Sequence, residues 1–142
     1  MSHQPETLDL NPATDAVTRA LQWLEEIGER EGWPPKLAFG LTLSVDEALT
    51  NVLSYAFAPA GPAHVPAVRL SYARDGADIV IEIADNGVPY DPTASAPPAL
   101  ADNIEDADIG GHGVRLMRHY LDELRYERRG EWNHLRLAVH SA

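Results

Sequence analysis

Glu47 and Asn51 lie four residues apart in a stretch with helical periodicity. At this spacing, two side chains project from the same side of a helix, one turn apart. A carboxylate there can orient or deprotonate an attacking hydroxyl group, and an amide oxygen suits Mg²⁺, which bridges substrate phosphates. The same pair is also common on solvated helix faces, so by itself it does not define a site.

A second polar group, Asp85-Asn86-Gly87, directly follows the alternating apolar stretch that ends at Ala84. A turn is expected there in any case, because Asn-Gly is common in turns. A carboxylate at the end of a strand can also accept a hydrogen bond from an exocyclic amine such as that of adenine. Gly87 would let a flat base approach the backbone closely.

A glycine-rich group, Gly110-Gly111-His112-Gly113, precedes a helix that is predicted to begin near Val114. Glycines at a helix start expose backbone N–H groups, which together with the positive end of the helix dipole form an anion site suited to phosphates. His112, Arg115 and Arg118 add local positive charge. The alternative interpretation is a flexible joint at the end of a loop.

Two helices are predicted ahead of these groups. A short strand at Glu6–Leu10 is followed by Asn11-Pro12, an N-cap with proline at the first helical position. Gly32 ends this helix, and Pro34-Pro35 opens the next one, which runs from about Pro35 to Phe57 and carries Glu47 and Asn51. The Glu47/Asn51 pair is therefore expected on the second helix.

Strands are predicted on either side of a third helix. Residues 68–83 alternate between apolar and polar around a turn at Asp75-Gly76, and a second pair of strands turns at Arg129-Gly130. Paired strands separated by helices predict an α+β fold, a two-layer α/β sandwich with helices on one face of a mixed, mainly antiparallel sheet.

The segment from Asp91 to Asp108 is rich in Pro, Ala and Asp, and Leu100 and Ile104 are its only sizeable apolar residues. A stretch of this length without regular structure is usually a functional lid or a disordered segment. It leads directly into the glycine-rich group, so a lid over about residues 91–110 is expected, with an order that depends on the bound ligand.

The composition predicts a single domain over residues 1–142. There are 22 acidic and 11 basic residues, and the formal net charge of −11 disfavours nucleic-acid partners, although acidity can also serve solubility alone. The chain has no cysteine, and no apolar run approaches the roughly 18 residues of a membrane-spanning helix. With a polar start that lacks the features of a signal peptide, the sequence predicts a cytoplasmic protein without a membrane partner.

The order of these groups along the chain resembles an ATP-binding family shared by histidine kinases, gyrase-type topoisomerases, the Hsp90 chaperone and MutL proteins. The closest resemblance is to the anti-sigma-factor serine/threonine kinases. It rests on the passages Ser44–Asn51, Ile83–Pro92, Gly110–Val114, Tyr120–Leu124 and Trp132–Leu137. The resemblance implies the Bergerat-type ATP-binding fold and extends from about Asn11 to Val139.

The resemblance also implies a role for each matching residue. Glu47 matches the general base, Asn51 the magnesium ligand, Asp85 the adenine contact and Gly87 the glycine beneath the base. Gly111, His112 and Gly113 match the segment that holds the phosphates. The implied cofactors are ATP and Mg²⁺. The implied partners are a sigma factor, a small anti-anti-sigma protein that is phosphorylated on serine or threonine, and a second copy of the chain in a homodimer.

The chain departs from the family pattern at two places. Pro89 stands where many relatives have a second glycine, a change that also occurs in the anti-sigma branch. No Lys or Arg occurs from Asp75 to Val114, whereas some relatives carry a basic residue just before Gly-x-Gly, where this chain has Asp108 and Ile109. The sequence therefore predicts ATP binding with two alternatives for its use: phosphoryl transfer, or a nucleotide-dependent protein-binding module without kinase activity.

Overall fold

The computed structural model describes residues 5–61, 63–93, 115 and 117–140. Its elements in chain order are β1 (Glu6–Leu10), α1 (Ala16–Glu31), α2 (Pro35–Tyr55), the short 3-10 helix η1 (Ala58–Ala60), β2 (Val68–Asp75), β3 (Asp78–Asp85), β4 (Glu123–Arg129) and β5 (Trp132–His140). Residues 115 and 117–120 are also helical and belong to the predicted third helix.

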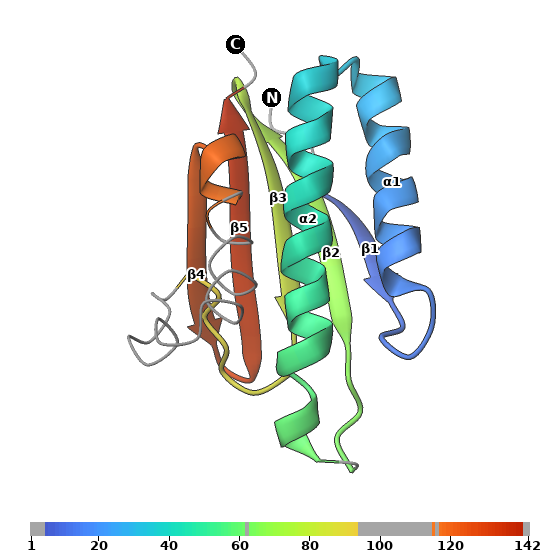
Figure 1. The fold of residues 1–142 in the computed structure, drawn as a ribbon, viewed down its shortest axis with the longest axis vertical. Helices are drawn as coiled ribbons and strands as arrows, with labels where there is room; N and C mark the ends of the chain where they lie inside the picture. Colours follow the sequence, from blue (N-terminus) through green and yellow to red (C-terminus); the bar gives the residue numbers. More distant parts are fainter. Residues whose placement is uncertain (1–4, 62, 94–114, 116, 141–142) are drawn as a thin grey trace, which may run out of the picture.

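The five strands form one sheet in the order β1-β2-β3-β5-β4, so β5 lies between β3 and β4. All four strand pairings are antiparallel. Figure 1 shows α1 and α2 side by side on one face of this sheet. The predicted α+β fold is confirmed, but the expected mixed sheet is antiparallel throughout the described strands.

The start of α1 differs from the prediction. Asn11 does not cap the helix, because its Oδ1 accepts a hydrogen bond from the N–H of Ala13 at 2.9 Å, which closes a local turn. The helix begins four residues later than expected, at Ala16. Its end is as predicted: Gly32 has the left-handed backbone, φ 70°, that favours glycine after a helix. α2 begins at Pro35 as expected and ends at Tyr55, two residues before the predicted Phe57.

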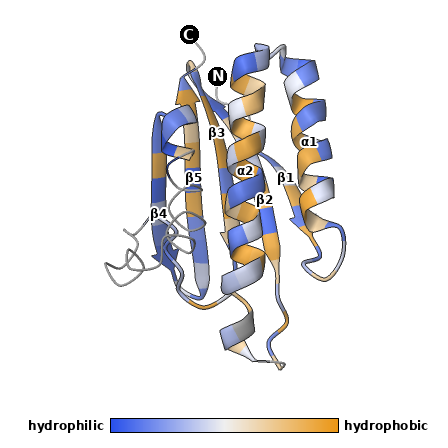
Figure 2. Cartoon of the chain, in the orientation of Figure 1, coloured by the Kyte–Doolittle hydropathy of each residue, from blue (hydrophilic) through white to orange (hydrophobic). Residues whose placement is uncertain are grey.

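The core lies between the helix layer and the sheet, and it collects the apolar residues that recur at helical or alternating spacing. Its fully buried large side chains are Leu24, Ile27, Leu41, Val45, Leu49, Val68, Leu70, Ile79, Ile81, Ile83, Met117 and Leu137. Figure 2 shows β4, at the edge of the sheet, as mostly hydrophilic. Within the described residues, no helix is long and apolar enough to cross a membrane.

Candidate functional site

Asp85 is the last residue of β3. The residue as a whole is only 2% exposed, so its carboxylate is buried. Its Oδ1 accepts hydrogen bonds from the backbone N–H of Gly87 and from Nδ2 of Asn133, both at 2.9 Å. Burial raises the pKa of Asp85, and these two hydrogen bonds oppose that rise. No described residue donates to Oδ2, so the second oxygen is left as an acceptor for a further donor.

Asn133 in β5 fixes this carboxylate, and the sequence did not predict it as a site residue. Its Nδ2 also donates to the carbonyl of Val88 at 2.8 Å, and its Oδ1 accepts from the hydroxyl of Tyr126 at 2.5 Å. Asn133 lies opposite Asp85 in the register of β3 and β5, on the face that otherwise carries Leu135, Leu137 and Val139. A polar residue in this apolar alternation was the signal that could have identified it.

Arg128 in β4 holds the turn after Asp85 from the other side. Its Nη1 donates to the carbonyl of Gly87 at 2.7 Å and to Oδ1 of Asn133 at 3.2 Å. The positive charge of Arg128 also lowers the pKa of Asp85, though less than burial raises it. The side chains of Arg128 and Asn133 therefore hold the turn after Asp85 against β4 and β5 by binding its backbone carbonyls.

Gly87 is required by close packing against the end of α2. A Cβ atom added to Gly87 would lie 2.8 Å from the carbonyl carbon of Ala56 and closer still to its oxygen. The same carbonyl accepts a hydrogen bond from the N–H of Val88 at 2.8 Å. The structure thus assigns Gly87 a packing role between the strand end and the helix, and its predicted place beneath a base stays a prediction.

Asn86, between Asp85 and Gly87, points to a different part of the molecule. Its Oδ1 accepts from the N–H of Ala67 at 2.7 Å, and its Nδ2 donates to the carbonyl of Val65 at 3.0 Å. Asn86 therefore anchors the loop that leads into β2.

Glu47 and Asn51 lie on the half of α2 that leads to Ala56, the residue that contacts Gly87. With a rise of 1.5 Å per residue, they precede Ala56 by about 14 Å and about 8 Å along the helix axis. Both residues are half-buried. No described residue donates a hydrogen bond to the side chain of either.

Tyr90, in the segment after Asp85, lies close enough to Glu47 for the charge of Glu47 to affect the pKa of its hydroxyl. Burial raises the pKa of the Tyr90 hydroxyl, and the nearby Tyr55 and the negative charge of Glu47 add to this rise. The rings of Tyr55 and Tyr90 lie 5.7 Å apart. The Glu47 side of α2 and the Asp85 turn therefore border the same region of the molecule.

The predicted lid and Gly111, His112 and Gly113 lie outside the described residues, apart from the first three residues of the lid. At the near end of this segment, Asp91 Oδ1 accepts from the N–H of Thr93 at 2.8 Å. Beyond its far end, Nη2 of Arg118 donates to the carbonyl of Thr93 at 3.2 Å. This hydrogen bond joins Arg118 to Thr93, the last described residue at the start of the predicted lid.

The described side chains do not form a metal cage. No group of three or more His, Asp or Glu side chains that could hold a metal ion occurs among the described residues. Mg²⁺ usually retains several waters and is bound through one or two protein ligands together with substrate phosphates, so a single amide oxygen such as that of Asn51 is compatible with this mode.

Two helices on one face of an antiparallel sheet, with Asp85 buried at the end of β3, form the framework of the candidate site. Residues 10–139 match the family described as the histidine kinase-like ATPase domain. The chain belongs to this family.

One relative is similar over the whole chain. The serine/threonine-protein kinase BtrW of Bordetella bronchiseptica is 47% identical over 142 residues, which is 100% of this chain and 98% of that protein. The predicted relationship to the serine/threonine kinases of this family is thereby confirmed.

A solved structure confirms the fold. The histidine kinase domain of the Erythrobacter litoralis EL346 blue-light activated histidine kinase is 21% identical, with a TM-score of 0.56. The similarity covers 89% of this chain and 59% of that one.

Proposed function

We propose that the chain binds Mg-ATP and phosphorylates a serine or threonine of a small anti-anti-sigma partner, and that it sequesters a sigma factor. The kinase part is supported by membership of the ATPase-domain family and by 47% identity to a serine/threonine-protein kinase. The sigma-factor and antagonist partners, the homodimer and a cytoplasmic location are supported by the sequence resemblance and composition alone.

The Asp85 carboxylate is the observation that carries nucleotide binding. Two donors already occupy Oδ1, whereas no described residue donates to Oδ2, so Oδ2 can accept a hydrogen bond from a ligand. The exocyclic amine of adenine is a donor of the required kind, whereas the corresponding carbonyl of guanine is an acceptor. The free acceptor oxygen of Asp85, Oδ2, therefore fits the exocyclic amine of an adenine nucleotide.

Glu47 and Asn51 would serve the reacting end of the nucleotide. Bound ATP would supply the phosphoryl group. The Glu47 carboxylate would accept the proton of the attacking hydroxyl, and the Oδ1 of Asn51 would hold Mg²⁺. Gly111 and Gly113 would present backbone N–H groups to the phosphates, with His112 between them.

The kinase proposal is tested with labelled ATP, a candidate antagonist protein and a Glu47→Gln variant. Transfer to the antagonist is expected from the natural chain. Glu47→Gln should abolish transfer and retain ATP affinity, because the amide keeps the shape of the side chain but cannot take the proton. Glu26→Gln, on the exposed surface of α1, is the matched control and should transfer normally. Unchanged transfer by Glu47→Gln would refute its role as general base.

A second function is favoured by one observation, the absence of Lys and Arg from Asp75 to Val114. Without a basic residue before the glycine-rich group, nucleotide could serve only to set the shape of a partner-binding surface. ATP-dependent binding of the antagonist, with no transfer by the natural chain over many hours, would identify this protein-binding module and exclude the kinase.

A further inference from the structure

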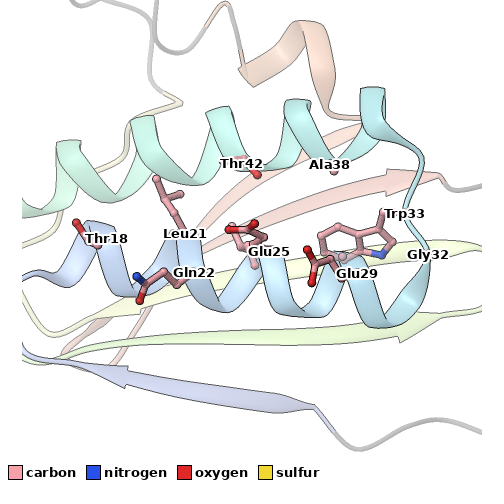
Figure 3. Close-up of a pocket in the computed structure, with 11 residues that line it drawn as sticks. Thr18, Leu21, Gln22, Glu25, Glu29, Gly32, Trp33, Ala38 and Thr42 are labelled. Carbon is pink, nitrogen blue, oxygen red and sulfur yellow. The ribbon is translucent and has the colours of Figure 1, made fainter.

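A groove of about 710 Å³ runs between α1 and α2, on the outer side of the helix layer (Figure 3). Its apolar lining comes from Leu21, Leu24 and Trp33, together with Ala38 on α2. Leu24 and Trp33 are buried core residues and form the floor of the groove. None of the residues of the proposed nucleotide site lines it.

Small residues create this groove. Gly28 lets the Trp33 ring pack directly against α1, since a Cβ at Gly28 would lie 2.9 Å from Cε3 of Trp33. Across the groove, α2 presents only Ala38 and Thr42. Because these side chains are short, the two helices do not fill the space between their outer surfaces. Leu21 and Ala38 stay partly exposed there, above the buried Leu24 and Trp33.

The edge of the groove is acidic. Glu25 and Glu29 are exposed, four residues apart, and lie on the groove side of α1 opposite Thr42 and Ala38 (Figure 3). None of the 11 lining residues is basic. α1 carries two cations, Arg19 and Arg30, and neither lines the groove. Arg30 is bound to Glu6 and Glu31.

We propose that this groove docks an amphipathic helix of a partner protein that carries Lys or Arg beside an apolar stripe. The apolar stripe would contact Leu21 and Ala38, the partly exposed apolar residues of the lining. The basic side chains would pair with Glu25 and Glu29. From Thr18 to Gly32 the groove follows α1 for about 21 Å, which matches roughly four turns of a docked helix.

Charge favours a basic partner helix over a helix from a second copy of the chain as the occupant of the groove. The chain has a formal net charge of −11, and α1 and α2 each carry more acidic than basic residues. Either of these helices from another copy would therefore bring further negative charge towards Glu25 and Glu29. A basic partner gains both the apolar contact and the attraction. The groove therefore fits a partner of opposite charge.

The groove is independent of the proposed nucleotide site. Thr42 and Glu47 are five residues apart on α2, which places them about 140° apart around the helix at 3.6 residues per turn. Variants on the groove should therefore leave ATP affinity unchanged, and failure of one proposal does not entail failure of the other.

The probe for this proposal is an 18-residue helical peptide of Leu and Lys with one apolar stripe, labelled for fluorescence anisotropy and titrated with the full chain. The double substitution Glu25→Gln/Glu29→Gln should weaken its binding about tenfold. The matched double substitution Glu26→Gln/Glu131→Gln removes the same charge from exposed positions outside the groove lining and should change the affinity less than twofold. A peptide with Glu in place of Lys should not bind.

A third variant tests the location of the peptide. Ala38→Trp should fill the groove and abolish peptide binding, with a far-ultraviolet circular dichroism spectrum and ATP affinity like those of the natural chain. Equal weakening by the two double substitutions would mean nonspecific attraction to an acidic protein and would overturn the proposal. A change from dimer to monomer in Ala38→Trp, seen by sedimentation, would assign the groove to a second copy and would also overturn it.

Discussion

Nδ2 of Asn133 donates a hydrogen bond to Oδ1 of Asp85 over 2.9 Å, joining two buried polar side chains that lie opposite each other in β5 and β3. The orientation of the Asp85 carboxylate is therefore set from within the sheet, by a residue 48 positions later in the chain. In the proposed nucleotide site, Asn133 is a positioning residue that directs the other oxygen of Asp85 to the base.

Asn133→Ala should weaken ATP binding about tenfold, because Asp85 loses a partner that holds its oxygen in place. The free energy of unfolding should also fall, since the Tyr126 hydroxyl loses its acceptor. Calorimetry and urea unfolding measure the two effects. The matched control is Asn86→Ala, which removes the bonds to Val65 and Ala67 and should lower stability with little change in ATP affinity. Equal losses of affinity would contradict the positioning role.

Asp85→Asn should weaken ATP binding roughly thirtyfold, equivalent to about 2 kcal/mol, because the amide can present a donor where the adenine amine needs an acceptor. The fold should persist, since the retained amide oxygen can still accept from Gly87 and Asn133. Titration calorimetry measures the affinity. An unchanged affinity would show that Asp85 does not contact the base.

The pH dependence of the free energy of unfolding should differ between the natural chain and Asp85→Asn. Burial raises the folded-state pKa of Asp85 above the ordinary value of 3.8, so between these two pKa values the folded chain binds more protons than the unfolded chain. The free energy of unfolding of the natural chain should therefore fall relative to that of Asp85→Asn as pH rises from below 3.8 towards neutrality. Urea unfolding across this range measures the difference, and a relative gain by the natural chain would contradict the raised pKa.

Gly87→Ala should destabilise the fold by about 1–3 kcal/mol, the usual cost of overpacking, because the added Cβ would press on the Ala56 backbone. ATP affinity should fall with it, since the turn after Asp85 must move. Gly76→Ala is the comparison, because its added Cβ meets nothing within 4 Å but its φ of +62° is strained. It should cost about 1–2 kcal/mol and leave ATP affinity unchanged. Thermal unfolding and calorimetry distinguish the two variants.

Nucleotide state should change amide hydrogen exchange in residues 91–114. Arg118, beyond this segment, donates a hydrogen bond to Thr93 near its start. The glycine-rich group near its far end is the predicted phosphate site. Only contacts that distinguish ATP from ADP can favour one lid state over another. Exchange should therefore be slower in Mg-ATP than in Mg-ADP, with a matching change in antagonist affinity. Identical exchange and affinity would remove the nucleotide switch.

Local patterns were enough to predict most elements of the fold. Pro35 opens α2 and Gly32 ends α1 because their backbone preferences act over one or two residues. The alternation in residues 68–83 predicted the β2–β3 hairpin, since side chains of a strand alternate between its two faces. The same locality explains the error at Asn11, where a side-chain bond to Ala13 replaced the expected helix cap.

The sequence by itself determined the helices, the hairpins and the candidate residues Glu47, Asn51 and Asp85, because each depends on neighbours within a few positions. Tertiary structure alone decided that β5 enters between β3 and β4, since this depends on which distant strands exchange hydrogen bonds. That insertion places Asn133 against Asp85. The apolar alternation of β5 marks Asn133 as an exception, but its contact with Asp85 in the candidate site depends on strands that are distant in the sequence.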